Sequence, residues 1–277
     1  MLSLLHNFQP AAVLAAYGPL TIYWYGLFMV LAILAAMSLT LWLAKHYQIN
    51  GEVIFDLSFW LIIGGLAGAR IYDDLLQLPY YWQHPWQSLA IWRGGLAIHG
   101  AIIAGALIIW LFARRRRLNF WRLGALIAPG LALGQAIGRW GNYFNQEIFG
   151  LPSDLPWSIP IDIINRPAQF IGRTHFHPTF LYESLGCLLI GLVLIAGHFY
   201  RLKNQRLDYY FDVLAVALYM ILYSILRFGL EFIRLDPAPA WLGWRWPQIA
   251  SLMLIAAASL LIVYYPYARL NQRNEKK

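Results

Sequence analysis

Seven long runs of apolar residues follow one another along the chain, and shorter polar segments separate them. Each run is close to the length of about 20 residues that an α-helix needs to cross the hydrocarbon core of a bilayer. The pattern therefore predicts transmembrane helices at residues 17–44, 54–77, 95–113, 120–138, 178–200, 211–230 and 246–267. The one long connection, residues 139–178, is too often interrupted by proline for a helix and too apolar for a solvated linker, so it predicts a small folded head.

The composition agrees with a chain whose solvent is lipid. Apolar residues make up 60% of the 277 residues and charged residues 12%, whereas a soluble domain has roughly a half and a quarter. The mean hydropathy is +0.53. A single cysteine, Cys187, excludes a disulfide scaffold. We therefore predict an all-α polytopic membrane protein, with residues 1–277 forming one integral membrane domain and residues 139–178 forming an extracytoplasmic head within it.

The basic residues between the predicted helices gather on one side of the membrane. Cytoplasmic segments carry an excess of lysine and arginine, so this side is predicted to be the cytoplasm, with the N-terminus outside and the C-terminus inside. The net charge of +8 is then a topology signal and indicates no nucleic-acid partner. No cleavable signal peptide is recognisable, so the first helix is expected to remain. The thirteen basic residues are Lys45, Arg114, Arg115, Arg116, Arg117, Arg122, Arg201, Lys203, Arg206, Arg269, Arg273, Lys276 and Lys277.

Several polar residues that are energetically unfavourable in lipid are expected at one depth in the membrane. With a helical rise of 1.5 Å per residue, Arg70, His99, Arg139 and Arg227 lie about 21 to 26 Å from the cytoplasmic ends of four different helices. In a hydrocarbon core about 30 Å thick, this depth is the outer third. Ionisable residues inside a membrane usually face the protein interior and mark a functional site. The remaining arginines outside the cytoplasmic set are Arg93, Arg166, Arg173, Arg234 and Arg245.

The sixth predicted helix carries a polar stripe. Tyr223, Arg227 and Glu231 are spaced by four residues, and Arg234 follows Arg227 by seven, so all four are expected on one face. One interpretation is that Arg227 and Glu231 neutralise each other so that the helix can insert. The other is that one carboxylate cannot cancel two guanidinium groups, which leaves positive charge for an anion such as phosphate.

The third predicted helix combines small residues with a histidine. Gly100 and Ala104 have the spacing that lets two helices approach closely. His99 is either a core residue with satisfied hydrogen bonds or, at the level of the arginines, a group that accepts a proton. His175 and His177 are close in sequence, but no carboxylate or cysteine cluster completes a ligand set, so we predict no metal site.

The densest polar segment runs from Gly138 to Gly150, where the fourth predicted helix ends. Flanking glycines let the backbone bend around Arg139 and let a ligand come close. An ordinary exit loop also contains asparagine and glycine, but this segment adds several donors and acceptors within about two helical turns. We expect substrate contacts from Arg139, Asn142, Asn145, Glu147 and Gly150.

The motif Gly-Arg-x-Gly-Asn-Tyr-x-Asn-x-Glu at residues 138–147 resembles the signature of the prolipoprotein diacylglyceryl transferase family. The chain departs from the family pattern at Ala101, at Phe180 and at Asp236-Pro237, which puts local loop geometry and substrate preference in question. Other matching stretches occur along most of the chain: Trp24-Tyr25-Gly26-Leu27, Gly68-Ala69-Arg70, Gly94-Gly95, His99-Gly100, His177-Pro178-Thr179, Leu181-Tyr182-Glu183, Arg227-Phe228, Glu231-Phe232 and Arg234.

The resemblance implies a transferase of the bacterial cytoplasmic (inner) membrane, with its active site toward the outer leaflet and no cofactor. It would transfer the diacylglyceryl group of phosphatidylglycerol to the lipobox cysteine of a prolipoprotein and release glycerol 1-phosphate. On this reading Arg139 and Arg227 hold the phosphate, and His99 is the candidate base. The further residues expected to bind substrate are Asn142, Asn145, Glu147, Gly150, Tyr25, Tyr223, Glu231 and Arg234, although Tyr25 and Tyr223 would also suit the role of interface anchors.

Two other classes of protein share some of these features. A transporter for an anionic solute would also bury arginines, but near the bilayer midplane and often within paired repeats, which the chain lacks. A non-catalytic membrane protein would explain helices and a head, but gives no reason for polar residues of four helices to share a depth.

Overall fold

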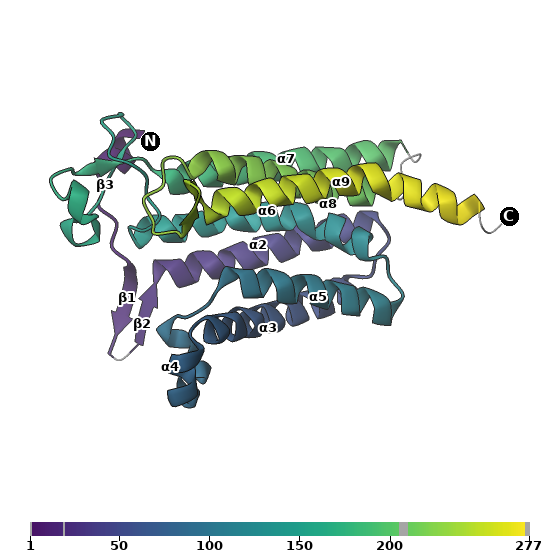
Figure 1. The fold of residues 1–277 in the computed structure, drawn as a ribbon, viewed down its shortest axis with the longest axis horizontal. Helices are drawn as coiled ribbons and strands as arrows, with labels where there is room; N and C mark the ends of the chain where they lie inside the picture. Colours follow the sequence, from purple (N-terminus) through teal and green to yellow (C-terminus); the bar gives the residue numbers. More distant parts are fainter. Residues whose placement is uncertain (1, 19, 205–209, 275–277) are drawn as a thin grey trace. The chain divides into compact units, whose positions relative to one another are not determined.

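The computed structural model describes residues 2–18, 20–204 and 210–274, so Arg206, Lys276 and Lys277 of the basic set lie outside it. Seven helices in the described part are long and apolar enough to cross a membrane (Figure 1). The predicted seven-helix membrane fold is therefore confirmed, while the sidedness of its ends stays a prediction. The seven are α2 (Trp24–His46), α3 (Gly51–Leu76), α5 (Ile98–Arg116), α6 (Phe120–Phe144), α7 (Thr179–Lys203), α8 (Tyr210–Leu230) and α9 (Trp246–Asn274).

Three helix boundaries differ by more than three residues from those predicted, and one of them is the C-terminal end of α9, which lies at Asn274 and not near residue 267. The first helix begins at Trp24 and not near residue 17, because the apolar residues before it pair as the antiparallel strands β1 (Val13–Tyr17) and β2 (Leu20–Tyr23). Gly18, between them, has a φ of +57°, a backbone conformation that glycine adopts without steric cost. The fourth predicted helix, α6, ends at Phe144 and not near residue 138, so Arg139 and Asn142 lie in its last two turns.

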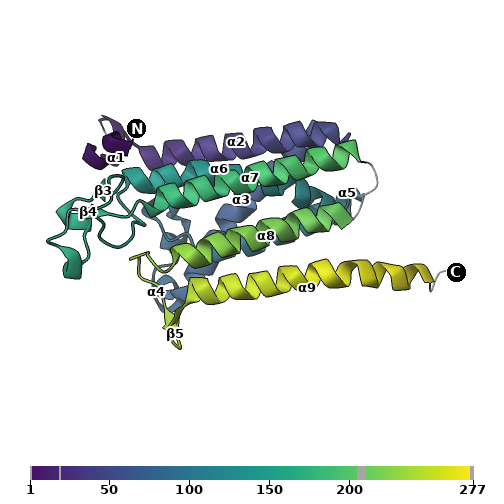
Figure 2. The same cartoon turned by 90° about the horizontal axis from the view of Figure 1, so that it is seen from above.

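The contacts divide the chain into two compact units. Unit 1 consists of residues 1–39 and 127–277, and unit 2 of residues 40–126. In unit 1, α8 lies between α7 and α9 (Figure 2). Ala128 and Ala132 of α6 pack with Ile190 and Leu194 of α7, and both pairs are buried. Small residues on α6 thus let these two helices approach closely.

Unit 1 also contains the small folded segment predicted between the fourth and fifth spans. After α6, the strands β3 (Ile159–Pro160) and β4 (His175–Phe176) pair antiparallel, with η3 (Ile163–Asn165) and η4 (Ala168–Phe170) between them. The short helix α1 (Leu2–Asn7) lies against β3. The buried core of this head joins residues of three parts of the chain: Tyr143, Phe149, Ile159, Ile161, Phe176 and Phe180.

In unit 2, α3 and α5 pack through glycines. A Cβ atom on Gly68 would lie 2.4 Å from Cβ of Ala104 and 2.7 Å from the carbonyl oxygen of Gly100. A Cβ on Gly100 would lie 2.1 Å from the carbonyl oxygen of Gly68. The packing role predicted for the small residues around Gly100 is confirmed, since only glycine lets the two backbones meet here.

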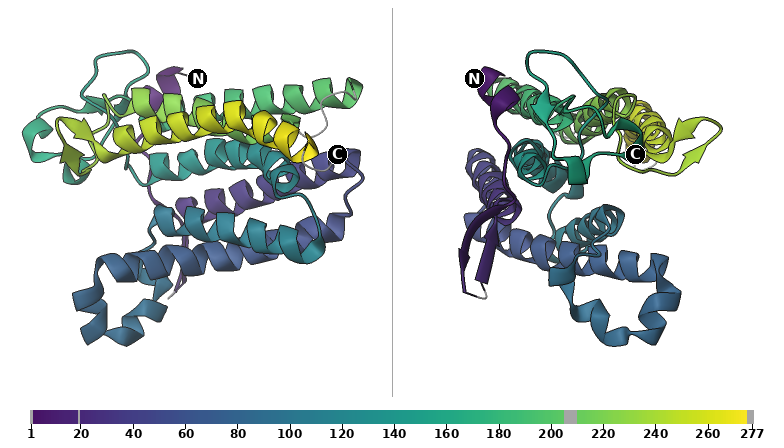
Figure 3. Two further views of the ribbon diagram at one scale, coloured as in Figure 1. Left: turned by 45° about the vertical axis from the view of Figure 1, so that its right-hand side comes forward. Right: turned by 90° about the vertical axis from the view of Figure 1, so that its left-hand side faces the viewer.

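The connection from α3 to α5 is organised by one arginine. It contains the short helices α4 (Leu78–Gln83), η1 (Pro85–Leu89) and η2 (Ile91–Arg93), seen in blue in Figure 3. Arg70 is buried and donates hydrogen bonds to the carbonyl oxygens of Gln87, Ser88, Gly94 and Gly95. Four of its five N–H groups thus hold the loop, so Arg70 has a structural role in unit 2.

The glycine contact between α3 and α5 leads to a prediction about stability. We expect Gly68→Ala to lower the unfolding temperature of the purified protein, because the added methyl group must push the helices apart at a cost of about 1–3 kcal/mol. Gly65→Ala on the same helix is the matched control, since its Cβ would meet nothing within 4 Å. Equal unfolding temperatures for the two variants, measured in detergent by thermal scanning, would contradict this description of the packing.

Candidate active site

A buried carboxylate joins three segments of unit 1. The Glu183 side chain, in the second turn of α7, is 1% exposed. Its Oε1 accepts hydrogen bonds from Nη2 of Arg139 at 2.6 Å and from the hydroxyl of Tyr223 at 3.0 Å. Its Oε2 lies 3.4 Å from Nη1 of Arg234. Glu183 therefore fixes groups from α6, from α8 and from the loop after α8 around one point.

A second set of contacts leads from Arg139 into the loop after α6. Nη1 of Arg139 donates to Oδ1 of Asn142 at 3.1 Å, and Nδ2 of Asn142 donates to Oε1 of Glu147 at 2.7 Å. Asn145 donates to the same Glu147 oxygen at 3.4 Å. Arg139 and Asn142 are three residues apart and so lie on one helix face, which explains why their side chains meet. Four of the predicted site residues thus form one network.

The loop that carries Glu147 is held by its neighbour Gln146. The Gln146 side chain is buried, donates to the carbonyl oxygen of Pro10 at 3.0 Å and to Oδ2 of Asp162 at 2.7 Å, and accepts from the Asp162 backbone N–H at 2.6 Å. Gln146 and Ile148 both have positive φ values, 51° and 56°. Such conformations persist in non-glycine residues only when the surroundings impose them. Glu147 is therefore presented by a preorganised loop.

A second buried carboxylate pairs with two further arginines. The Glu231 side chain is fully buried; its Oε2 lies 2.8 Å from Nη2 of Arg227, and its Oε1 lies 3.1 Å from Nε of Arg245. Arg245, in β6 (Trp244–Arg245), also donates to the backbone carbonyl oxygens of Glu231, Arg234 and Asp236. Among the described residues, Nη1 of Arg227 is a buried donor without a hydrogen-bond partner.

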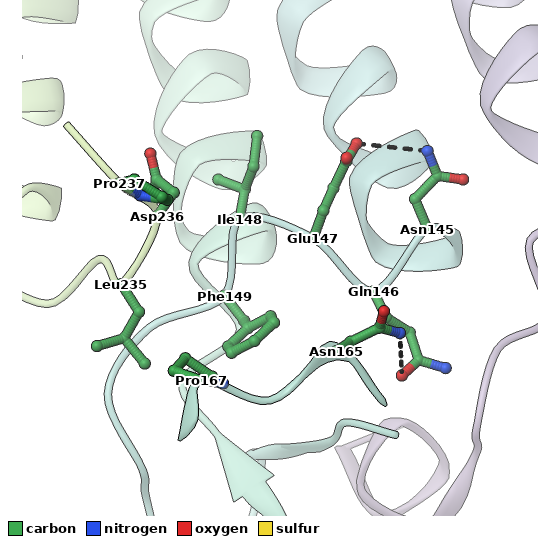
Figure 4. Close-up of a pocket in the computed structure, with 10 residues that line it drawn as sticks. All are labelled: Asn145, Gln146, Glu147, Ile148, Phe149, Asn165, Pro167, Leu235, Asp236 and Pro237. Atoms are coloured by element: carbon green, nitrogen blue, oxygen red, sulfur yellow. Dashed lines mark hydrogen bonds between the residues drawn. The ribbon is translucent and has the colours of Figure 1, made fainter. Parts of the chain in front are cut away.

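A cavity of about 380 Å³ lies in unit 1 beside the two sets of ion pairs around Glu183 and Glu231 (Figure 4). It is bounded by the loop after α6, by part of the head and by the loop after α8. Asp236, in its wall, accepts a hydrogen bond from Nε of Arg234 at 2.6 Å. The lining residues are Asn145, Gln146, Glu147, Ile148, Phe149, Asn165, Pro167, Leu235, Asp236 and Pro237.

The family of the chain follows from its similarity to known proteins. The model of the family described as prolipoprotein diacylglyceryl transferase matches residues 12–264. The chain belongs to this family. Relatives named phosphatidylglycerol–prolipoprotein diacylglyceryl transferase include one from Nostoc sp., 47% identical over 231 residues, or 82% of this chain and 80% of the relative. Others are from Synechococcus elongatus, 45% identical over 257 residues (92% and 88%), and Synechocystis sp., 39% identical over 272 residues (97% and 95%).

In this member of the prolipoprotein diacylglyceryl transferase family, the polar stripe differs in detail from the prediction. Helix α8 ends at Leu230, so Glu231 and Arg234 lie in the turn that follows. The argument that a single carboxylate faces two arginines is wrong, because Glu183 and Asp236 also pair with Arg234.

The positive surplus nevertheless remains. Four guanidinium groups meet three carboxylates in these ion pairs, so the ion-paired groups carry one positive charge more than negative (4 − 3 = 1). Glu147 is not one of these ion-paired groups and is joined to Arg139 only through Asn142. The guanidinium groups are those of Arg139, Arg227, Arg234 and Arg245, and the carboxylates are those of Glu183, Glu231 and Asp236.

The charge of Asp236 is stabilised by the arginines around it. Burial alone would raise the pKa of this carboxyl group, but the hydrogen bond from Arg234 and the positive charges of Arg234, Arg227 and Arg245 lower its pKa below the ordinary value. A carboxyl pKa that is lower in the folded state contributes stability above about pH 4, and this contribution is lost as the pH falls through the folded-state pKa. Asp236 is therefore ionised at neutral pH.

Gly150 and Tyr25 both pack closely against neighbouring residues. A Cβ on Gly150 would lie 2.9 Å from atoms of His177, Ile233 and Thr179. Gly150 also forms an isolated β-bridge with Arg234, which ties the two loops of the cavity together. The ring of Tyr25 lies against Gly141, where a Cβ would come within 2.9 Å of Cδ2 of Tyr25. Direct contact of Gly150 and Tyr25 with substrate stays a prediction.

The histidines and the cysteine have separate surroundings. His99 lies in unit 2, in the first turn of α5; it is exposed, and its ring centroid is 5.9 Å from that of Tyr72. Nδ1 of His177 lies 3.1 Å from the Tyr182 hydroxyl, within hydrogen-bond distance, and burial lowers the pKa of His177. Cys187 is fully buried on α7, with its Sγ 3.8 Å from Oε1 of Gln135.

The sequence alone assigns no role to two residues of the site, Glu183 and Arg245. Glu183 lies in a matching family motif, but the stronger signal is that it is the one carboxylate in an otherwise apolar span, which marks it as costly unless it is paired. Arg245 was recognised as an arginine outside the cytoplasmic set. Its partner Glu231 is fourteen residues away across a hairpin of β5 (Ala240–Trp241) and β6, a contact that spacing alone does not predict.

We expect Arg245→Gln to lower both the unfolding temperature and the activity. Removing one cation from a buried ion pair costs about 3–5 kcal/mol, and three backbone carbonyl groups also lose their donor. The matched control is Arg173→Gln, because Arg173 forms an exposed ion pair, 3.6 Å from Asp154, that contributes little to stability. Thermal unfolding and activity measured on both variants test this. If Arg245→Gln were as stable and as active as Arg173→Gln, Arg245 would have no positioning role.

Proposed function

We propose that this protein transfers the diacylglyceryl group of phosphatidylglycerol to a cysteine thiol of a prolipoprotein. The observation that carries the proposal is the buried arginine cluster with its surplus positive charge, in a chain whose family members act on these two substrates by name. The acceptor is the lipobox cysteine of the precursor, and the released product is glycerol 1-phosphate.

The reaction forms one carbon–sulfur bond and breaks one carbon–oxygen bond. The thiolate of the acceptor cysteine attacks the sp³ glycerol carbon that carries the phosphate, and the phosphate leaves with both electrons of the carbon–oxygen bond. A phosphodiester with one negative charge thereby becomes a phosphomonoester with an additional negative charge. No oxidation state changes, so the proposal requires no cofactor. The protein must stabilise the charge that develops on the leaving phosphate.

Arg139 and Arg227 are suited to that task. Their side chains are 22% and 16% exposed, so each is partly open while its partner carboxylate is buried. Nη1 of Arg227 has no hydrogen-bond partner among the described residues. A guanidinium group presents paired N–H donors to phosphate oxygens and remains charged at any relevant pH. Fixed positive groups in a site of low dielectric stabilise the transition state more than the less charged ground state.

The other residues of the network position these two arginines. Glu183 and Asn142 hold Arg139 by its two terminal nitrogens, and Tyr223 shares the Glu183 oxygen. Arg245 shares Glu231 with Arg227, so Arg227 is not fully neutralised by its own ion pair. Held in this way, the guanidinium groups need little rearrangement when charge develops on the phosphate.

The acceptor thiol must lose its proton before it attacks. A free cysteine has a pKa of about 8.5, so a base or a positive field is needed at neutral pH. His99, which is exposed at the start of α5 in unit 2, is the candidate base of this proposal, because imidazole is the side chain that most often serves as a general base. Cys187 has no role in the reaction, since it is fully buried and the substrate supplies the thiol.

We further propose that the protein lies in the bacterial cytoplasmic (inner) membrane, with the head outside and the active site toward the outer leaflet. The thirteen basic residues between the apolar runs support this orientation, because they fall on the side of the C-terminus. They also explain the basic composition, so the proposal includes no nucleic-acid partner.

The function is tested by incubating purified protein with phosphatidylglycerol and a peptide that contains a lipobox cysteine. We expect mass spectrometry to detect a peptide with a thioether-linked diacylglyceryl group and an equal amount of glycerol 1-phosphate. Arg139→Lys should lower the rate at least about tenfold, because an ammonium group cannot make the paired contacts of guanidinium. Arg115→Lys is the matched control, since Arg115 is exposed at the end of α5. The absence of thioether product with the unaltered protein would refute the function.

A further inference from the structure

We propose that the 380 Å³ cavity of unit 1 binds the polypeptide substrate, holding the extended residues next to the acceptor cysteine. This inference rests on the proposed function, since it assigns one of the two substrates to a place in the site. Its volume lies within the range of about 300–1,000 Å³ that is usual for ligand sites.

The walls of the cavity do not suit phosphate. None of its lining residues is a lysine, arginine or histidine, whereas Glu147 and Asp236 contribute carboxylates. Two carboxylates repel an anionic group but accept hydrogen bonds from N–H groups. The phosphate of the lipid is therefore expected at the arginine cluster. The polypeptide, whose backbone is rich in N–H groups, is expected at the cavity. The carboxamides of Asn145 and Asn165 add groups that both donate and accept, as the backbone of an extended peptide requires.

The cavity presents both polar and apolar side chains. In Figure 4, Ile148 points toward the helices together with Glu147 and Asp236, whereas Phe149 and Leu235 point the opposite way. An extended peptide places successive side chains on opposite sides, so it can meet polar and apolar groups at once. The glycerol head group of the lipid has hydroxyl groups but no apolar part to contact Phe149 and Leu235. This difference favours the polypeptide over the lipid head group.

The cavity is also connected to the residues that would hold the phosphate. Asp236 contacts Arg234 at 2.6 Å, and Glu147 contacts Asn142, which in turn contacts Arg139. A polypeptide in the cavity would thus lie beside the arginine cluster, as attack on the lipid requires. Pro237, Asn165 and Glu147 in its wall are exposed, so a chain can enter from outside the protein.

The loop on one side of the cavity is rigid enough to select a ligand. Gln146 fixes it to the head through Asp162, and the Thr179 hydroxyl donates to the carbonyl oxygen of Ile148. The positive φ of Ile148, which is rare for a β-branched residue, is thereby maintained. A site that is already ordered loses less conformational entropy when a flexible peptide binds.

The test fills the cavity without changing a charge. Asn165→Phe places a large side chain in the wall, and Ile164→Phe is the matched control, because Ile164 is 87% exposed and does not line the cavity. We expect Asn165→Phe to raise KM for the lipobox peptide about tenfold, with KM for phosphatidylglycerol in mixed micelles within about twofold of the unaltered protein. Ile164→Phe should change neither constant. Asn165→Ser should fold normally and raise the peptide KM by a smaller factor.

A cross-linking measurement keeps the result independent of folding effects. A lipobox peptide with benzoylphenylalanine directly after the cysteine should, without lipid, label residues 145–149 or 235–237 of the unaltered protein. The inference is overturned if KM for phosphatidylglycerol rises instead, if neither KM changes, or if the label is found elsewhere. In these cases thioether is still formed and only the cavity assignment fails, whereas absence of thioether with the unaltered protein refutes the proposed function itself.

Discussion

The site depends on the burial of two carboxylates, Glu183 and Glu231, among helices that are otherwise apolar. A carboxylate in such surroundings is stable only when cations pair with it. Glu183 pairs with Arg139 and Arg234 and also accepts a hydrogen bond from Tyr223, whereas Glu231 is held by its ion pairs with Arg227 and Arg245. Because the carboxylates cannot be left unpaired, the arginines cannot move freely. The same constraint that makes the cluster costly therefore gives it fixed geometry.

This geometry separates two kinds of chemistry within unit 1. The arginine cluster carries a surplus positive charge and suits phosphate, whereas the neighbouring cavity presents carboxylates, carboxamides and apolar side chains. Asp236 and Asn142 connect the two regions through single contacts with Arg234 and Arg139. A transferase with one anionic and one polypeptide substrate needs such a division, since each substrate must be recognised by groups that disfavour the other.

Much of this could be predicted from the sequence, and the rest depends on contacts between distant segments. Apolar runs predict the seven helices because lipid imposes both length and composition, but the same rule wrongly extends the first helix over β2, whose residues are equally apolar. Spacing along one helix correctly grouped Arg139 with Asn142. It could not show that Glu183 lies between Arg139 and Arg234, or that Arg245 reaches Glu231, because these pairs are joined only by packing.

The central claim, that a buried carboxylate fixes the arginines for catalysis, is tested most directly by steady-state kinetics of Glu183→Gln. This change keeps the shape of the side chain and removes its charge; Asp154→Asn, at an exposed carboxylate, is the control. We predict that folded Glu183→Gln protein is recovered from the membrane with a lower unfolding temperature, because one partner of a buried ion pair is removed. Its kcat should be at least about a hundredfold lower, with no increase of KM for phosphatidylglycerol, because the cluster becomes more positive but Arg139 loses its anchor. A folded Glu183→Gln protein with unchanged kcat would contradict the account.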